Sequence, residues 1–309
     1  MPEGPFMKTN PLITIRNKCP TCEKDNMNVI YSISCSDSRY QQFLALEPTY
    51  SDAFFSEFNE LMNDVNFEVA KCVNCGMIFQ TIVLSDAGMK KYYEEWISDK
   101  KLEEYRAMSN HSDYYRSRIK FVEFMTNIKQ MKILDWGAGT GEFCSIAKSL
   151  EHKPFAYEFS EERIKTMNRL GIEVINEADL EENYFDFINI DQVLEHLSWP
   201  LGELKKIARY LKNDGVIFVS TPNCLSIEKL LINNSLTKKT FEQISPHQHI
   251  NAFNNKTLRY LCESAGMVLL YMPFIKALFD GKLEKKWVMK NYLKLFFATS
   301  FFLVKTESR

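Results

Sequence analysis

Hydrophobic and polar positions follow two different patterns along the chain, and the change falls near residue 131. From there on, apolar runs of strand length alternate with stretches whose apolar positions have helical spacing. Such an alternation is typical of a parallel sheet that is covered by helices on both faces. The pattern predicts strands at 132–136, 153–159, 171–176, 185–191 and 215–221, and helices at 142–151, 161–169 and 200–211.

Smaller features refine this α/β prediction. Ser160 predicts a capped start for the second of these helices, and "KNDG" at 212–215 predicts a turn before the fifth strand. Two late apolar segments, 267–275 and 299–307, predict a closing antiparallel pair. The connection at 222–250 is long for a compact domain, and long connections often serve as lids.

The part of the chain before residue 131 has a separate organisation. From 19 to 80 there are nine acidic side chains against three basic ones, a balance of −6. The apolar stripe "AFFSEFNELM" predicts a helical insertion within residues 40–68. Residues 86–130 have apolar spacing that suits helices, and they contain three candidates for a ligand pocket that would fit the core or surface as well: Tyr114, Tyr115 and Arg116.

Four of the eight cysteines form two C-x-x-C pairs. Two residues between thiolates let both sulfurs bind one ion, and four thiolates make a closed structural zinc site. The pairs therefore predict Zn²⁺ bound by Cys19, Cys22, Cys72 and Cys75, with Gly76 at the positive φ that often follows such a pair. The alternative is a set of redox-active or incidental thiols. The remaining cysteines have apolar neighbours and are expected in the core: Cys35, Cys144, Cys224 and Cys262.

The composition indicates the cellular location and the partners of the protein more than any reaction that it catalyses. The 309 residues are 45% hydrophobic and 25% charged, and their net charge of −2 does not indicate a nucleic-acid partner. The first residues hold no apolar core long enough for a signal peptide, and the apolar run 295–304 is too short to span a bilayer. We therefore expect a cytoplasmic protein without a membrane partner, whose cysteines are thiols or metal ligands.

A glycine turn follows the first predicted strand, in "ILDWGAGTGEF". Its spacing, Gly137, Gly139 and Gly141, differs from the dinucleotide pattern G-x-G-x-x-G, and no Gly-Lys-Ser/Thr follows as in a P-loop. Asp135 would repel a phosphate and favours a ligand that carries positive charge. Glu158 ends the second strand, where a carboxylate accepts hydrogen bonds from a ribose diol. A cofactor with ribose and adenine but no phosphate is S-adenosylmethionine.

The wider sequence resembles a known enzyme family. The stretches "ILDWGAGTGEF", "AYEFS", "FDFINIDQVLEHL" and "GVIFVSTPN" look like the successive motifs of class I S-adenosylmethionine-dependent methyltransferases. "HQHINAFNNKTLRYLCESAGM" resembles a bacterial branch that modifies small molecules and saccharides, in which many members carry an N-terminal zinc module. The likeness extends from about Cys19 to the end of the chain.

This resemblance implies an architecture. The fold class would be α/β: a Rossmann-like, seven-stranded, mostly parallel sheet with an antiparallel final strand, preceded by a small four-cysteine zinc module and helices. The implied domains are a zinc-binding module at 1–84, a helical linker or lid at 85–130 and a methyltransferase domain at 131–309.

The resemblance also implies the contacts to the cofactor. The three glycines would line its methionine part, with Asp135 near the amino group. Trp136 departs from the family, where a smaller residue is common, and it either narrows the turn or packs on the sheet. The other implied contacts are Glu158 to the ribose hydroxyls, Phe159 on the adenine, Asp179 near the adenine amino group, and Asp191 with Gln192 beside the methyl group.

Methyl transfer is an in-line displacement, so the enzyme mostly positions the acceptor, but a hydroxyl acceptor also needs a general base. The catalytic candidates are His196, His247 and His249. His196 follows the fourth strand, where the acceptor is expected; its alternative role is to tether the next loop with Glu195. His247 and His249 share one side of an extended stretch, and no carboxylate with suitable spacing is apparent for a second metal there. His152 is expected in solvent.

The sequence leaves several functions open. The favoured one is O-methylation of a small-molecule acceptor, a saccharide or secondary metabolite, with a sugar or nucleotide-linked sugar as the expected partner. C-methylation of a nucleotide-linked deoxysugar is an alternative. An RNA methyltransferase that binds its target through the zinc module is another; the acidic module opposes it, whereas residues 256–309, with ten basic and four acidic side chains, favour it. A non-enzymatic scaffold conflicts with the intact glycine turn.

Overall fold

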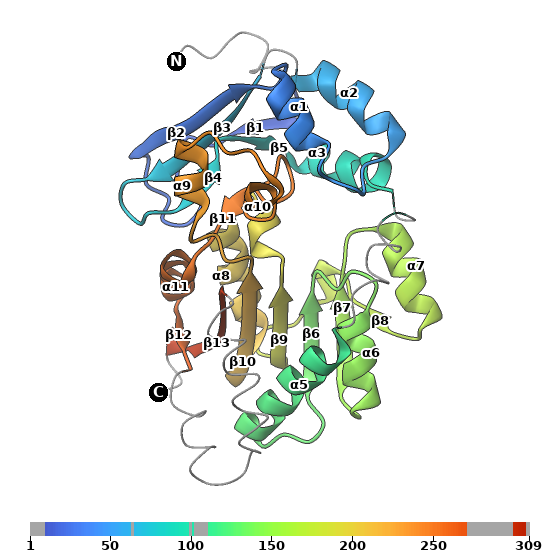
Figure 1. Cartoon of the computed structure of the whole chain (residues 1–309). Coiled ribbons are helices and arrows are strands. Elements are labelled where there is room, and N and C mark those ends of the chain that lie inside the picture. The colour runs from blue at the N-terminus through green and yellow to red at the C-terminus, as the bar shows by residue number, and fades with distance from the viewer. Residues whose placement is uncertain (1–9, 63–64, 99–100, 102–110, 271–298, 307–309) are drawn as a thin grey trace. The chain divides into compact units, whose positions relative to one another are not determined.

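Contacts within the chain divide it into two compact units. The structure is a computed structural model and describes residues 10–62, 65–98, 101, 111–270 and 299–306 (Figure 1). The N-terminal unit comprises Met1–Ser109, Glu195–Trp199 and Cys224–Thr257, and the α/β unit comprises Asn110–Leu194, Pro200–Asn223 and Leu258–Arg309. Two segments that follow residue 131 thus belong to the N-terminal unit. The domain boundaries taken from the sequence stay a prediction.

A seven-stranded sheet in the order β12-β13-β10-β9-β6-β7-β8 forms the α/β unit. β13 runs antiparallel to both of its neighbours, β10 and β12, whereas the strands from β10 to β8 pair in parallel. The predicted fold class is therefore confirmed. The strands are β6 (Lys132–Trp136), β7 (Lys153–Tyr157), β8 (Glu173–Val174), β9 (Phe185–Asp191), β10 (Leu211–Thr221), β12 (Met267–Leu269) and β13 (Thr299–Lys305).

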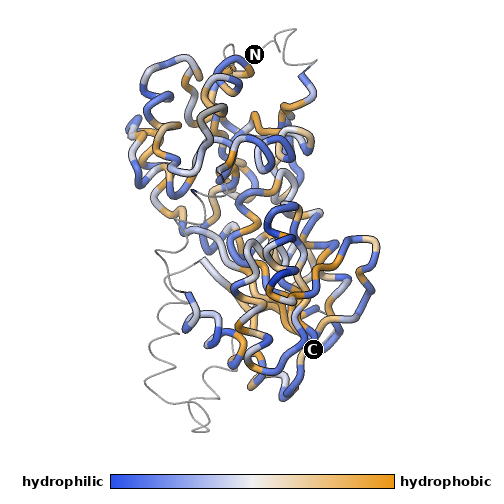
Figure 2. The backbone as a smooth tube through the Cα atoms, turned by 90° about the vertical axis from the view of Figure 1, so that its right-hand side faces the viewer, coloured by the Kyte–Doolittle hydropathy of each residue, from blue (hydrophilic) through white to orange (hydrophobic). Residues whose placement is uncertain are grey.

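Helices cover both faces of this sheet, as a central parallel sheet requires. α5 (Ser112–Thr126) and α6 (Glu142–Ser149) lie on one face and α8 (Pro200–Tyr210) on the other (Figure 1). Apolar residues run along the strands between these layers (Figure 2). On the α5 side, the core joins Val122 of α5 and Phe143 of α6 to Phe187 and Phe218 of the sheet.

Several predicted elements are found at their expected places. α7 (Glu161–Arg169) begins as predicted, with the Ser160 hydroxyl accepting a hydrogen bond from the Arg163 N–H at 3.5 Å. α11 (Asn255–Ser264) precedes the closing pair β12 and β13, which is confirmed. Residues 271–275 and 307 of the predicted pair lie outside the described part of the chain.

Two expectations are wrong. The predicted turn at 212–215 belongs to β10, which begins at Leu211 and shifts its register against β9 before Val216. Gly215 permits this irregular start, because a Cβ there would lie 2.8 Å from Leu211 Cδ1. His152 is buried rather than in solvent, and its Nδ1 accepts a hydrogen bond of 3.2 Å from the Met131 N–H, which leads into β6.

The N-terminal unit contains two antiparallel sheets. One pairs β1 (Ile13–Ile15) with β5 (Ile82–Leu84). The other has the order β11-β4-β3-β2, with β2 at Met27–Ser34, β3 at Asn66–Cys72, β4 at Ile78–Gln80 and β11 at Asn251–Ala252. The predicted helical insertion lies between β2 and β3, as α1 (Ser38–Leu44) and α2 (Asp52–Met62); α3 (Asp86–Lys91) and a π-helix (Tyr92–Trp96) follow β5.

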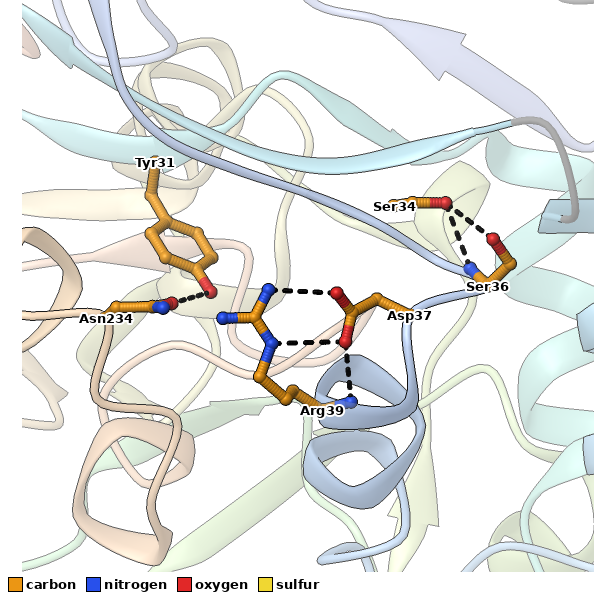
Figure 3. Close-up of polar contacts among 6 residues, drawn as sticks. All are labelled: Tyr31, Ser34, Ser36, Asp37, Arg39 and Asn234. Atoms are coloured by element: carbon orange, nitrogen blue, oxygen red, sulfur yellow. Dashed lines mark hydrogen bonds and ion pairs between the residues drawn. The ribbon is translucent and has the colours of Figure 1, made fainter.

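The long connection after β10 is built into the N-terminal unit. It forms α9 (Ile227–Ile232) and α10 (Lys238–Phe241) before it reaches β11. The Tyr31 hydroxyl of β2 donates to Asn234 Oδ1 at 2.8 Å, near the Asp37 side chain that caps α1 (Figure 3). Lys71 of β3 forms an ion pair of 2.7 Å with Glu228. A lid role for this connection stays a prediction.

Among the residues described, no helix combines the length and the apolar character needed to cross a membrane.

Candidate active site

The glycine turn joins β6 to α6 and depends on residues without a side chain. Gly137, Gly139 and Gly141 have φ values of +78°, +58° and +81°, which side chains disfavour. A Cβ at Gly137 would lie 2.8 Å from Val193 Cγ2, and one at Gly141 would lie 2.6 Å from Ile172 Cδ1. The turn is therefore a cradle that any larger residue would fill or distort.

Glu158 is tied directly to this turn. Its Oε2 accepts a hydrogen bond of 2.9 Å from the Gly139 N–H, and its Oε1 accepts from the N–H groups of Phe159 and Ser160 at 2.9 and 3.1 Å. Arg163 Nη1 forms an ion pair of 3.6 Å with Glu158 Oε2. The structure thus brings the predicted ribose ligand and the predicted glycine turn together, at the carboxyl ends of β6 and β7.

Two further predicted contacts lie at this end of the α/β unit with exposed side chains. Phe159 is 71% exposed, although its ring contacts Tyr157 with a centroid distance of 5.1 Å. An aromatic face left this open is available to stack on a planar ligand. Asp179 ends a short 3₁₀ helix and accepts a long hydrogen bond of 3.4 Å from Asn176.

A buried polar network lies below the turn, at the ends of β6 and β9. Asn189 donates to Asp135 Oδ1 at 2.7 Å and accepts from Arg118 Nη1. Arg118 Nη1 also lies 3.0 Å from Asp191 Oδ2. Burial raises the pKa of Asp135 to about 7, against the opposing effect of the hydrogen bond from Asn189. The network therefore holds one carboxyl group that titrates near neutral pH.

Arg118 is the residue of this network that the sequence interpretation missed. Its side chain is 2% exposed and lies over the ring of Phe218, 3.7 Å from the centroid. Within the described residues, its Nε and Nη2 have no hydrogen-bond partner. A buried guanidinium with unused donors fits an anionic group of a ligand. Its position on the apolar stripe of α5, next to Ile119 and Val122, is a signal that the sequence did contain.

The remaining predicted positions complete this edge of the sheet. Ser220 of β10 donates to Asp191, and the Gln192 side chain donates to Ser220 Oγ at 3.1 Å. Gln192 has a φ of +57°, so the chain turns sharply where β9 ends. Trp136 packs on the sheet: its ring stacks on Tyr157 with a centroid distance of 3.9 Å.

The comparison with protein families agrees with this geometry. Residues 106–271, more than half of the chain, match the family model described as "Methyltransferase domain". The chain belongs to this methyltransferase family. The match confirms the predicted enzyme class, an S-adenosylmethionine-dependent methyltransferase.

Solved structures of other methyltransferases share the fold. The plantazolicin methyltransferase BpumL in complex with SAH is 17% identical to this chain. The match covers 70% of this chain and 93% of the BpumL chain, with a TM-score of 0.50. The plantazolicin methyltransferase BamL is 14% identical, with coverages of 71% and 94% and a TM-score of 0.50. At such identities the likeness shows the fold alone. None of the curated proteins matches the chain.

The four paired cysteines of this methyltransferase converge in the N-terminal unit. The sulfurs of Cys19 and Cys75 lie 3.6 Å apart, those of Cys22 and Cys72 lie 3.5 Å apart, and all four lie within 4.8 Å of one another. Zn–S bonds of about 2.3 Å in a tetrahedron place sulfurs about 3.8 Å apart. Gly76 has the expected positive φ, +80°. The donor set and its spacing therefore fit a tetrahedral zinc ion.

Within this cluster the thiolate form is favoured locally at Cys19, whereas burial raises the pKa of Cys22 and the hydrogen bond to Cys19 raises the pKa of Cys75. Hydrogen bonds to the Cys19 sulfur lower its pKa to about 5, chiefly the one from Cys75 and then those from the N–H groups of Thr21 and Cys22, against the opposing effect of burial. The other four cysteines are buried as predicted: Cys35, Cys144, Cys224 and Cys262.

The candidate catalytic histidines belong to the N-terminal unit, and their surroundings differ. His196 and His249 lie with their ring centroids 5.0 Å apart, and both are half-buried. His196 Nε2 lies 3.9 Å from Glu195 Oε1. His247 is buried with both ring nitrogens, packs edge-on against Phe58, and has its pKa lowered by burial to about 3. The less enclosed rings of His196 and His249 are more accessible to a substrate proton than that of His247, but burial lowers the pKa of His249 as well, to about 4.

Proposed function

We propose that this methyltransferase binds S-adenosylmethionine at the carboxyl ends of β6, β7 and β9 and transfers its methyl group to a small-molecule acceptor. The single observation that carries this proposal is the hydrogen bond from the Gly139 N–H to Glu158, directly above the buried network of Asp135, Asn189 and Arg118. One continuous edge of the sheet then offers partners for a ribose, an ammonium and a carboxylate.

Each part of the cofactor has a partner in this arrangement. Glu158 would accept from the ribose hydroxyls, because a carboxylate has acceptor capacity beyond its three present hydrogen bonds. Phe159 would stack on the adenine, and Asp179 would meet the adenine amino group. Asp135 would face the ammonium and Arg118 the carboxylate of the methionine part. The bound cofactor supplies an electrophilic methyl group, which Asp191 and Gln192 would adjoin.

For the acceptor we propose a saccharide or secondary metabolite, with O-methylation favoured over C-methylation of a nucleotide-linked deoxysugar. Removal of a hydroxyl proton would fall to His196 or His249, whose rings lie together. RNA as the acceptor remains the weaker proposal, because the N-terminal module is acidic. We further propose that Cys19, Cys22, Cys72 and Cys75 hold a structural Zn²⁺ and that the protein works in the cytoplasm.

Calorimetry with S-adenosylmethionine tests the cofactor site. Gly139→Arg should abolish binding, because Gly139 has a left-handed backbone and its N–H holds Glu158. The matched control is Gly202→Arg, since Gly202 is exposed on α8 and has open space around its Cβ direction. Binding of equal strength in Gly139→Arg and the parent would overturn the proposed site.

A further inference from the structure

Three potential metal ligands, from two segments that are far apart in the sequence, meet within the N-terminal unit. Glu195, His196 and His249 each offer one ligand atom, and these atoms all lie within 4.8 Å of one another. They are distinct from the four cysteines. No carboxylate close to His249 in the sequence could join it in a metal site. In the fold, the segment Glu195–Trp199 lies beside His249, and Glu195 provides that carboxylate.

Hydrogen bonds fix the two segments that carry these residues. The Ile250 N–H donates to Glu195 O at 2.9 Å, and the Asn251 side chain donates to Leu197 O at 2.6 Å. The His249 N–H donates to Ser245 Oγ at 3.1 Å. Neither histidine segment can therefore slide along the other without losing the two hydrogen bonds from Ile250 and Asn251.

A buried arginine strengthens this frame. Arg16 is 1% exposed, and its guanidinium donates to Ser198 O at 3.2 Å, to Ile250 O at 2.9 Å and to Asn251 Oδ1 at 2.8 Å. Arg16 thus binds both segments that carry the proposed ligands. Each residue that it contacts lies at most two positions from His196 or His249 in the sequence. Metal sites require this type of support, because ligands must be held in place before the ion arrives.

The orientation of His249 is that of a metal ligand. Its Nδ1 lies 3.1 Å from the carbonyl oxygen of Glu242, so Nδ1–H donates there and Nε2 carries the free lone pair. A backbone carbonyl behind a ligating imidazole is the usual outer partner in metal sites.

We propose that Glu195, His196 and His249 form a second metal site, which binds a first-row divalent cation such as Zn²⁺ with an open coordination position. Ligand atoms around zinc lie about 3.2–3.6 Å apart, because the bonds are about 2.0–2.2 Å long. The present separation of 3.9 Å between His196 Nε2 and Glu195 Oε1 needs only a small side-chain rotation to reach this range.

An open position distinguishes this site from the closed cysteine site. A hydroxyl group or water that coordinates there would lose its proton to solvent more readily, because the cation lowers the pKa of a bound oxygen ligand. With the ion bound, His196 and His249 would act as ligands, and the cation would replace them as the means of activating the hydroxyl group. The proposal does not rest on methyl transfer, since binding of the ion can be measured alone.

Titration of the purified full-length protein with Co²⁺ tests this inference. Co²⁺ bound by nitrogen and oxygen gives visible d–d bands without the near-ultraviolet charge-transfer band of cobalt thiolate, so the two sites are separable. We expect one equivalent of the nitrogen–oxygen type. Glu195→Gln, which keeps the side-chain volume, and His249→Ala should each weaken it at least tenfold. His111→Ala is the matched control, because His111 is exposed and lies outside the cluster.

The Co²⁺ titration and the cofactor titration test the second metal site and the proposed function separately. Absence of the nitrogen–oxygen spectrum in the parent overturns the second site, and so does Co²⁺ binding of parental strength in either cluster variant. Far-ultraviolet circular dichroism and S-adenosylmethionine affinity establish that each variant is folded. If Glu195→Gln is folded and His249→Ala is not, Glu195→Gln alone decides. A parent that binds Co²⁺ in this way but not the cofactor supports this inference and overturns the proposed function.

Discussion

The two units of this methyltransferase build their sites by different means. In the α/β unit, most of the implied cofactor contacts follow the ends of β6, β7 and β9, and the parallel topology alone brings those ends together. In the N-terminal unit, the cysteines come from two separate knuckles, and the histidines are joined through Arg16 and Asn251. The first site is a property of the sheet, whereas the second depends on particular long-range bonds.

The largest effect is expected where one variant removes a cross-link of the N-terminal unit. Cys72→Ser should lose the proposed zinc ion and lower the free energy of unfolding of that unit by several kcal/mol, because metal-binding free energy is also folding free energy. The affinity for S-adenosylmethionine should stay within about twofold at temperatures where the α/β unit is folded. Metal analysis, scanning calorimetry and titration measure the three quantities.

A buried cysteine of the same unit supplies the control. Cys35→Ala should retain one zinc per chain, because Cys35 packs in the apolar core and is not one of the four clustered sulfurs. If Cys72→Ser also kept its zinc, the four-cysteine site would be ruled out. If its cofactor affinity collapsed along with the zinc, the contrast between a self-sufficient sheet site and a cross-linked unit would not hold.

A smaller effect is expected at the cofactor edge, from Arg118→Met. The variant removes the cation that faces Asp191 and the donors proposed for the methionine carboxylate. Affinity for S-adenosylmethionine should fall about 10–100-fold, or about 1.4–2.8 kcal/mol. Adenosine, which lacks the methionine part, should bind as well as it does to the parent. Calorimetry with both ligands separates a lost contact from a damaged site.

Arg116→Met is the matched control for that variant. Arg116 lies two residues earlier on α5 with an exposed side chain, so both ligands should bind it with parental affinity. An equal loss of adenosine and S-adenosylmethionine binding in Arg118→Met would mean that Arg118 only supports the sheet. In that case its unused donors would have no bearing on the ligand.

These differences explain what the sequence could predict. β6, β9 and α7 match their predicted bounds because buried strands and a capped helix leave local signals. All implied cofactor contacts except Asp179 lie within the family motifs quoted from the sequence, which begin or end at these strands. Arg118 was missed although it interrupts the apolar stripe of α5, because its partners Asn189 and Asp191 are distant in the sequence and become its neighbours only in the fold. The meeting of Glu195 with His249, and the place of residues 224–257 in the N-terminal unit, depend on pairings that no local pattern encodes.

Near neutral pH, the smallest effect should be a pH dependence of cofactor binding that comes from Asp135. Burial raises the pKa of this carboxyl to about 7, so below pH 7 its neutral form predominates in the free protein. The proposed ammonium partner prefers the carboxylate, so binding releases a proton, and affinity should fall up to about tenfold for each pH unit below 7. Above pH 7 the affinity should level off. Titrations between pH 5.5 and 8 measure this profile, and Asp135→Asn should bind more weakly at pH 8 with a flat profile. A parental profile without a slope below pH 7 would show that Asp135 does not face a cation, and the ammonium would then have to be placed elsewhere along the edge of the sheet.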